Sequence, residues 1–206
     1  IEKKVNYAKH VTEWREMPEL KKAEEAIKNK DNVAIIDWYK KAAAKNNAIA
    51  MLFLGRAYDN GYYDLTKSST EAFKWYTKAA EKENRSALMQ IGYMYFFGDG
   101  IDKNIDEGLK YCKKAADLGS TSAMRSLASI YLDGIYMGRS GDFKLDEKEA
   151  LKWFEKAGEA GNYYGAIGVA EMYYYSNIGK SITKDNDKAF AWAKKARELA
   201  KEESEK

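Results

Sequence analysis

Proline and cysteine are almost absent from the 206-residue sequence. The single proline, Pro18, leaves the rest of the chain without the strongest helix breaker, and this favours an all-helical fold. The single cysteine, Cys112, excludes an intramolecular disulfide and a zinc site built from several cysteines. The cysteine content therefore leaves the compartment open.

Long apolar runs and an excess of one charge are also missing. No stretch approaches the roughly 20 apolar residues that cross a bilayer, and no signal sequence is recognisable. The 35 basic and 32 acidic residues are interspersed and leave a net charge of only +3. Charge therefore gives no case for nucleic acid as a partner, and we expect neither nucleic-acid binding nor a membrane span.

Reactive side chains do not gather in a catalytic pattern. His10 is the only histidine, and no cysteine or serine motif accompanies it. Cys112 falls on the apolar face of a helix, where we expect a buried thiol. The acidic residues Asp99, Asp102 and Asp106 lack the closing glutamate of a calcium loop, and we expect Asp106 to cap a helix. The sequence thus predicts no catalytic residue, no metal site and no cofactor.

Large aromatic residues recur along the chain with a nearly constant period. They are Trp38, Trp75, Tyr111, Trp153 and Trp192, at intervals of 37, 36, 42 and 39 residues. Such a period is typical of solenoids built from two-helix repeats. Each aromatic residue belongs to a Lys- and Ala-rich helix, and a second helix follows after a short polar turn.

A small residue marks the second helix of each repeat, seventeen places after the aromatic residue. These residues are Gly55, Gly92, Ala128 and Ala170. Glycine inside a helix costs about 1 kcal/mol relative to alanine, so its recurrence at one position indicates that two helices pack closely there. A tyrosine three places further on lies on the same helical face and should pack inward: Tyr58, Tyr95, Tyr131 and Tyr173.

Residues 1–32 are expected to form a lead-in segment and a capping helix. Pro18 suits the first turn of a helix. Leu20, Ala23 and Ile27 then follow at helical intervals and form one apolar stripe. We expect this stripe to cover the open face of the first repeat.

Residues 33–200 are expected to form an array of about four repeats and a terminal capping helix. Residues 201–206 are polar and should form a fraying tail. Between Gly134 and Trp153 the spacing is longer than in the other repeats, which predicts an outward loop around residues 136–143.

The order of these marks resembles the Sel-one-like repeats, a branch of the tetratricopeptide superfamily. The resemblance covers roughly residues 33–200 and departs from the family pattern at Cys112 and Ser176. The clearest copy contains Ala87, Ile91-Gly92, Tyr95, Gly98-Asp99-Gly100-Ile101, Asp106 and Lys113-Lys114-Ala115-Ala116.

The resemblance implies an all-α fold, a right-handed α-solenoid superhelix of antiparallel helix pairs with a concave groove that binds proteins or peptides. Members are typically adaptors, and bacterial members are often exported proteins that contact a host or neutralise a secreted toxin. The resemblance therefore favours a bacterial protein that is exported or periplasmic rather than cytoplasmic.

In such arrays the second helix of each repeat lines the concave side, so its non-core positions are expected to contact a partner. Aromatic and arginine residues, which binding hot spots favour, are frequent there. For aromatic residues such as Phe96 the alternative is packing in the core. The expected partner-binding residues are Arg56, Asp59, Met89, Tyr93, Phe96, Arg125, Tyr164, Glu171 and Tyr174.

The leading hypothesis is a monomeric module that binds another protein in its groove and, in a narrower form, a bacterial immunity protein that occludes a secreted toxin. The first alternative is a glycan- or small-molecule-binding protein, or a cryptic hydrolase, that stacks sugars on tyrosines beside Glu171. An open groove is shallower than most such sites. The second alternative is a fragment of a longer repeat scaffold, because the sequence does not begin with Met.

Overall fold

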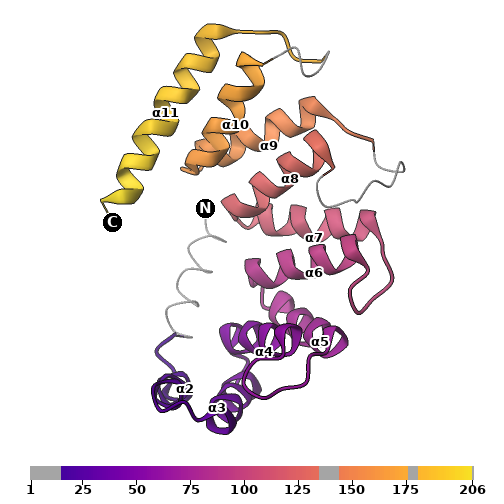
Figure 1. Cartoon of the computed structure of the whole chain (residues 1–206), viewed down its shortest axis with the longest axis vertical. Coiled ribbons are helices and arrows are strands. Elements are labelled where there is room, and N and C mark those ends of the chain that lie inside the picture. Colours follow the sequence, from indigo (N-terminus) through magenta and orange to yellow (C-terminus); the bar gives the residue numbers. More distant parts are fainter. Residues whose placement is uncertain (1–14, 135–143, 176–180, 206) are drawn as a thin grey trace. The chain divides into compact units, whose positions relative to one another are not determined.

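The described part of the chain is built from α-helices alone (Figure 1). A computed structural model describes residues 15–134, 144–175 and 181–205. His10 and the loop expected around residues 136–143 lie outside these ranges, as does Ser176. The prediction of an all-helical fold is confirmed. The helices are α2 (Pro18–Lys28), α3 (Asn32–Ala44), α4 (Ala48–Asn60), α5 (Ser69–Glu81), α6 (Arg85–Phe97), α7 (Ile105–Asp117), α8 (Thr121–Asp133), α9 (Glu147–Glu159), α10 (Tyr163–Tyr174) and α11 (Asn186–Ser204).

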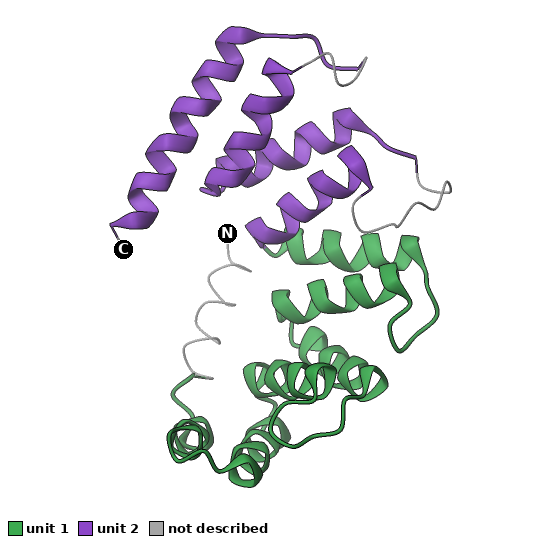
Figure 2. Ribbon diagram, in the orientation of Figure 1, with its two compact units in different colours: residues 1–118 green, residues 119–206 purple. Residues whose placement is uncertain are grey.

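The helices fall into two compact units (Figure 2). Unit 1 comprises Ile1–Leu118 and contains α2 to α7, and unit 2 comprises Gly119–Lys206 and contains α8 to α11. Within each unit, consecutive helices pack against each other. We call the first helices of the repeats (α3, α5, α7, α9 and α11) the A helices, and the second helices (α4, α6, α8 and α10) the B helices.

Every A and B helix begins at a side-chain cap. In each case the backbone N–H of the third residue beyond the cap donates to the capping oxygen, at 2.9 to 3.2 Å. Each such cap contributes about 1 kcal/mol to helix stability. Asn104 caps α7, so the expectation that Asp106 is a cap is wrong: Asp106 lies in the first turn. The caps are Asp31, Asn47, Ser68, Asn84, Asn104, Ser120, Asp146, Asn162 and Asp185.

The recurring small residue of the B helices lies at a close helix–helix contact in unit 1. Gly55 of α4 faces the ring of Tyr76 from α5. A methyl group at Gly92 of α6 would lie 2.6 Å from the Cys112 Sγ and 3.1 Å from the carbonyl oxygen of Gly108. Both glycines are buried, so the packing reason expected for them is confirmed.

The recurring tyrosines are half-buried beside this contact. Tyr95 of α6 packs between Phe73 of α5 and Tyr111 of α7, with ring centroids 5.9 and 5.7 Å away. Phe73, Tyr95 and Tyr111 therefore form a packed aromatic row across α5, α6 and α7.

Two end features differ from expectation. In α2 the core residues are Leu20, Ala23 and Ala26, whereas Ile27 is exposed. The face of α2 that carries Leu20, Ala23 and Ala26 packs against α3, and Ile27 lies outside that face. At the other end, α11 continues to Ser204, into the segment expected to be a tail, because good helix formers fill it and Lys201 pairs with Glu205 at 3.9 Å.

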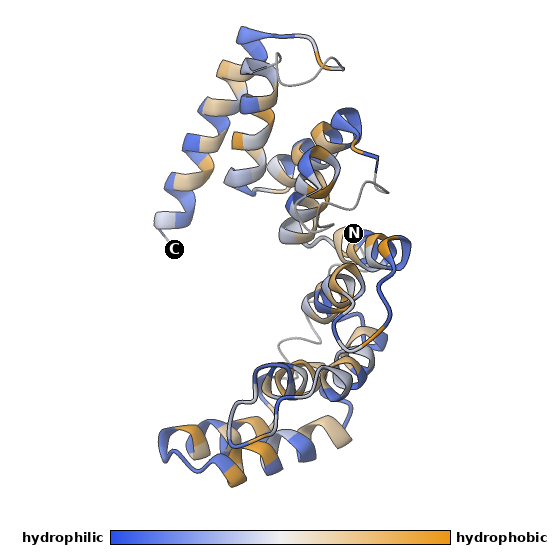
Figure 3. Ribbon diagram, turned by 45° about the vertical axis from the view of Figure 1, so that its right-hand side comes forward, coloured by the Kyte–Doolittle hydropathy of each residue, from blue (hydrophilic) through white to orange (hydrophobic). Residues whose placement is uncertain are grey.

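Hydrophilic residues are distributed over all of the described helices (Figure 3). On α11 they alternate with hydrophobic residues along the whole length. None of the described helices combines the length and the apolar character needed to cross a membrane.

We expect Gly92→Ala to destabilise unit 1, although alanine favours helices more than glycine does. Overpacking a core costs about 1–3 kcal/mol, which outweighs the helix-propensity gain of about 1 kcal/mol. Denaturant unfolding of both proteins measures the change. The double variant Gly92→Ala/Cys112→Ala should recover part of the loss, because it removes the sulfur that the new methyl group meets. An equal loss in both variants would contradict this packing.

Candidate protein-binding surface

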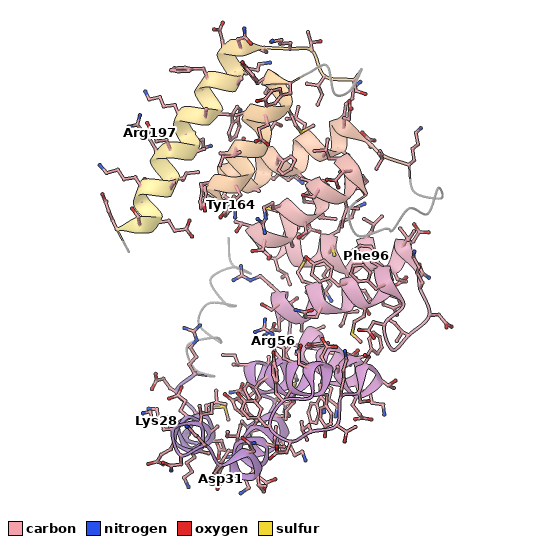
Figure 4. All side chains as sticks on the ribbon, in the orientation of Figure 1. Lys28, Asp31, Arg56, Phe96, Tyr164 and Arg197 are labelled. Atoms are coloured by element: carbon pink, nitrogen blue, oxygen red, sulfur yellow. The ribbon has the colours of Figure 1, made fainter. Side chains whose placement is uncertain are left out.

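The B helices of unit 1 present some of the expected partner-binding residues and bury others. Arg56 on α4 is exposed (Figure 4), and Tyr93 on α6 is half-buried. Met89 and Phe96 on α6 are core residues, with Phe96 only 1% exposed. The expectation that these two side chains contact a partner is therefore corrected: they stabilise the contact between helices.

Phe96 is buried because the facing helix makes room for its ring. Gly108 of α7 stands at the fourth position after the helix cap, where α5, α9 and α11 carry alanine, and the Phe96 ring lies against it. Cys112 replaces the larger Tyr76 of the preceding A helix. The phenylalanine of the B helix thus fills the space that a tyrosine of the A helix fills one repeat earlier.

Asp59 of α4 is half-buried and engaged within unit 1. The Tyr76 hydroxyl donates to the Asp59 Oδ2 at 3.3 Å. Burial raises the pKa of the Asp59 carboxyl, and the Tyr76 hydrogen bond opposes part of that rise. Burial also raises the pKa of Tyr76, so its hydroxyl stays protonated and remains a donor. The Asp59 carboxylate therefore holds the Tyr76 side chain, and it is also partly exposed at the surface.

In unit 2 the expected residues on α8 and α10 are all exposed. On α10 three of them join Ile167 in a single line along the helix, at intervals of three, four and three residues. Tyr164, Ile167 and Tyr174 are 50%, 37% and 52% exposed. We call Tyr164, Ile167, Glu171 and Tyr174 the α10 stripe. Ile167 occupies the same repeat position as Arg125, and that offset could have added it to the expected residues.

The first residue of the α10 stripe is held in place by neighbours. The guanidinium carbon of Arg125, on α8, lies 5.2 Å from the centroid of the Tyr164 ring. The Tyr163 and Tyr164 ring centroids are 4.0 Å apart. A hydrogen bond with Tyr164 raises the pKa of Tyr163 to about 12. Tyr164 is therefore an exposed aromatic group whose position is fixed from two sides, and its place on α10 is marked in Figure 4.

The cysteine and the possible metal-binding groups can be located among the described residues. Cys112 is fully buried, as expected, and burial raises its pKa to about 12, which keeps the thiol protonated at neutral pH. No group of three or more His, Cys, Asp or Glu side chains in the described ranges is arranged to hold a metal ion.

The fold and the repeated contacts define a two-helix solenoid repeat protein. The Sel1 repeat model matches residues 36–47, 48–84, 85–120, 121–162 and 164–200. The chain therefore belongs to the Sel1 repeat family. Sel1 repeat proteins generally mediate protein–protein interaction, and their scaffold is typically a non-catalytic interaction module.

The chain is similar to several solved structures. A Sel1 repeat protein from Oxalobacter formigenes is 30% identical with a TM-score of 0.67, and the match covers 82% of this chain but only 65% of that chain. The protective antigen c5321 from uropathogenic Escherichia coli is 24% identical over 82% of this chain and 42% of its own, with a TM-score of 0.48. The immunity protein Pa5087 from Pseudomonas aeruginosa is 18% identical over 80% of this chain and 73% of its own, with a TM-score of 0.46.

We expect Asp59→Asn to raise the melting temperature at neutral pH. Asparagine keeps an acceptor for the Tyr76 hydroxyl and removes a charge that burial disfavours. Because the folded-state pKa is raised, the wild type loses stability relative to the variant as pH rises above the unfolded value of about 3.9.

Thermal unfolding at about pH 3 and pH 7 measures this dependence. The advantage of the variant should be larger at the higher pH, whereas the control Asp37→Asn, at an exposed position of α3, should show little change. A constant difference between Asp59→Asn and the wild type would contradict the raised pKa.

Proposed function

We propose that the chain binds a partner protein or peptide through the exposed face of its B helices, and that in unit 2 the α10 stripe is the centre of the binding surface. The observation that carries the proposal is the line of three large apolar side chains on one exposed helical face. Contiguous apolar exposure of this kind is typical of interaction sites in soluble proteins.

Large apolar residues at two of these repeat positions are exposed on α10 but not on α6. At the repeat position of Ile167, α4 has the half-buried Leu52, α6 has the buried Met89 and α8 has the exposed Arg125. At the position of Tyr174, α6 has the buried Phe96. Two positions that support the core in α6 thus lie on the surface in α10, where they can contact another molecule.

The composition of this surface suits a protein partner. Tyrosine and arginine are enriched among the residues that dominate binding energy. Tyr164 is already ordered by Arg125 and Tyr163, so less conformational entropy is lost when a partner covers it. Glu171 adds a negative charge in the middle of the stripe.

Unit 1 also offers a surface for the same function. Arg56 on α4 is exposed and Tyr93 on α6 is half-buried. Both were expected to contact a partner, and we keep that expectation for them. The narrower proposal, that the partner is a secreted toxin which the chain neutralises, rests on the family resemblance. An assay of the captured partner's activity, with and without the chain, would test it.

We expect the variant Tyr164→Ser/Ile167→Ser to lose its partner. Hot-spot side chains contribute about 2 kcal/mol or more each, which is about 30-fold in affinity per residue, so the loss of both should weaken binding by roughly 900-fold. Affinity capture with the intact chain identifies the partner, and titration calorimetry then measures the affinity of each variant. Circular dichroism verifies that the variants stay helical.

A matched control changes two exposed apolar residues of unit 1, Val33→Ser and Tyr62→Ser. This control should bind as the wild type does. Equal affinity of the stripe variant and the wild type would refute the role of the α10 stripe, as would an equal loss in the control.

A further inference from the structure

A hollow of about 410 Å³ opens between α10 and α11, within unit 2. Its lining is largely apolar and includes Ala170 of α10 and Ala189 and Ala193 of α11. Three exposed aromatic residues border it, Tyr174, Tyr175 and Phe190, and Phe190 is 73% exposed. The hollow therefore combines small residues in its lining with exposed aromatic rings.

The hollow arises because α11 lacks a large side chain that other A helices carry. At the eighth position after the cap, α3, α5 and α9 have Tyr39, Tyr76 and Phe154, all buried. The same position of α11 is Ala193, which is exposed. The small residue of the preceding B helix is affected too: Ala170 is half-buried, whereas Gly55, Gly92 and Ala128 are buried.

The compensation found in unit 1 is not available here. In α7 the small Cys112 stands at this eighth position, and the Phe96 ring fills the space by packing on Gly108. In unit 2 Tyr174 corresponds to Phe96, but Ala189 takes the place of Gly108. Ala189 carries a methyl group where Gly108 has none, and the Tyr174 ring stays about half exposed. Neither helix fills the space.

A charged group defines one side of the hollow. Glu171 borders it, is exposed, and has no ion pair or side-chain hydrogen bond within the described residues. The basic group of Lys184 lies 5.2 Å from the Tyr174 ring centroid and is not part of the lining. A ligand in the hollow therefore meets mainly apolar groups, the amide of Asn186 and a carboxylate that no described residue pairs, which favours a basic neighbour on the ligand.

We propose that this hollow binds an aromatic side chain of a partner protein segment, with a lysine or arginine beside that aromatic residue pairing with Glu171. The aromatic ring takes the place that Tyr76, Phe96 or Phe154 fills from within the chain in other repeats. The inference rests on the proposed function, because Glu171 and Tyr174 belong both to the α10 stripe and to the border of the hollow.

The direct test uses short blocked peptides, so that no partner has to be known. The probe is acetyl-Gly-Phe-Lys-Gly-amide, compared with the same peptide carrying Ala for Phe or Glu for Lys. Nuclear magnetic resonance titration of the full chain should show saturable shifts at Ala170, Ala189 and Ala193. Binding should weaken about tenfold without the ring and about threefold with the reversed charge.

Two variants and a matched control locate the site. Ala193→Phe places a ring where Phe154 and Tyr76 have theirs, and should weaken peptide binding at least about tenfold without lowering the melting temperature. Ala191→Phe, at an exposed position of the same helix, should bind as the wild type does. Glu171→Lys should reverse the preference between the lysine and glutamate peptides.

Three outcomes overturn the proposal. They are unchanged peptide binding by a folded Ala193→Phe, absence of saturable shifts at the hollow, and a concentration-dependent dimer that Ala193→Phe dissociates, which would make a second copy the occupant. Capture of the partner separates the two proposals. If Ala193→Phe still captures the partner and the stripe variant does not, the proposal for the hollow is refuted and the proposed function stands. If the peptide binds specifically but the stripe variant still captures the partner, the proposed function is refuted and the proposal for the hollow stands.

Discussion

The close contact between each B helix and the A helix that follows it is the constraint on which the packing of both units depends. Two helices can approach there only if one of them carries a small residue, and the gap beside that residue must then be filled by a large side chain from either helix. Tyr76 fills it from the A helix over Gly55, and Phe96 fills it from the B helix over Gly108. The identity of the filling residue changes from repeat to repeat, but the need for one does not.

The fold was predictable from the sequence because its signals are local and repeated. Three marks recur along the chain at fixed offsets from one another: a large aromatic residue, a small residue and a capping side chain before the helix. Each mark has a physical cause within a few residues. The ends of the array were harder. In α2 the core contains Ala26 in place of Ile27, because that detail depends on how α2 meets α3. The helix α11 extends past residue 200, because good helix formers continue there.

The candidate surface was predictable only in part, because exposure depends on pairs of residues in different helices. Position in the repeat correctly placed Arg56, Arg125 and the residues of α10 on the surface. It failed for Met89 and for Phe96, whose ring is buried against Gly108 of the facing helix. A comparison of the two helices position by position, with glycine in place of alanine as the signal, would have identified the exchange.

The need for a large side chain beside each small residue also explains the surface of α11. An array selected for stability alone would carry a large apolar residue at Ala193, since filling a gap of this kind recovers the transfer and contact energy of a buried ring. Instead α11 has alanine at this position and exposes Phe190, and α10 exposes Tyr174 beside Glu171, which has no ion pair among the described residues. The contact between α10 and α11 thus forgoes stability while the aromatic groups around it stay exposed. This pattern is expected where a surface is kept open for another molecule.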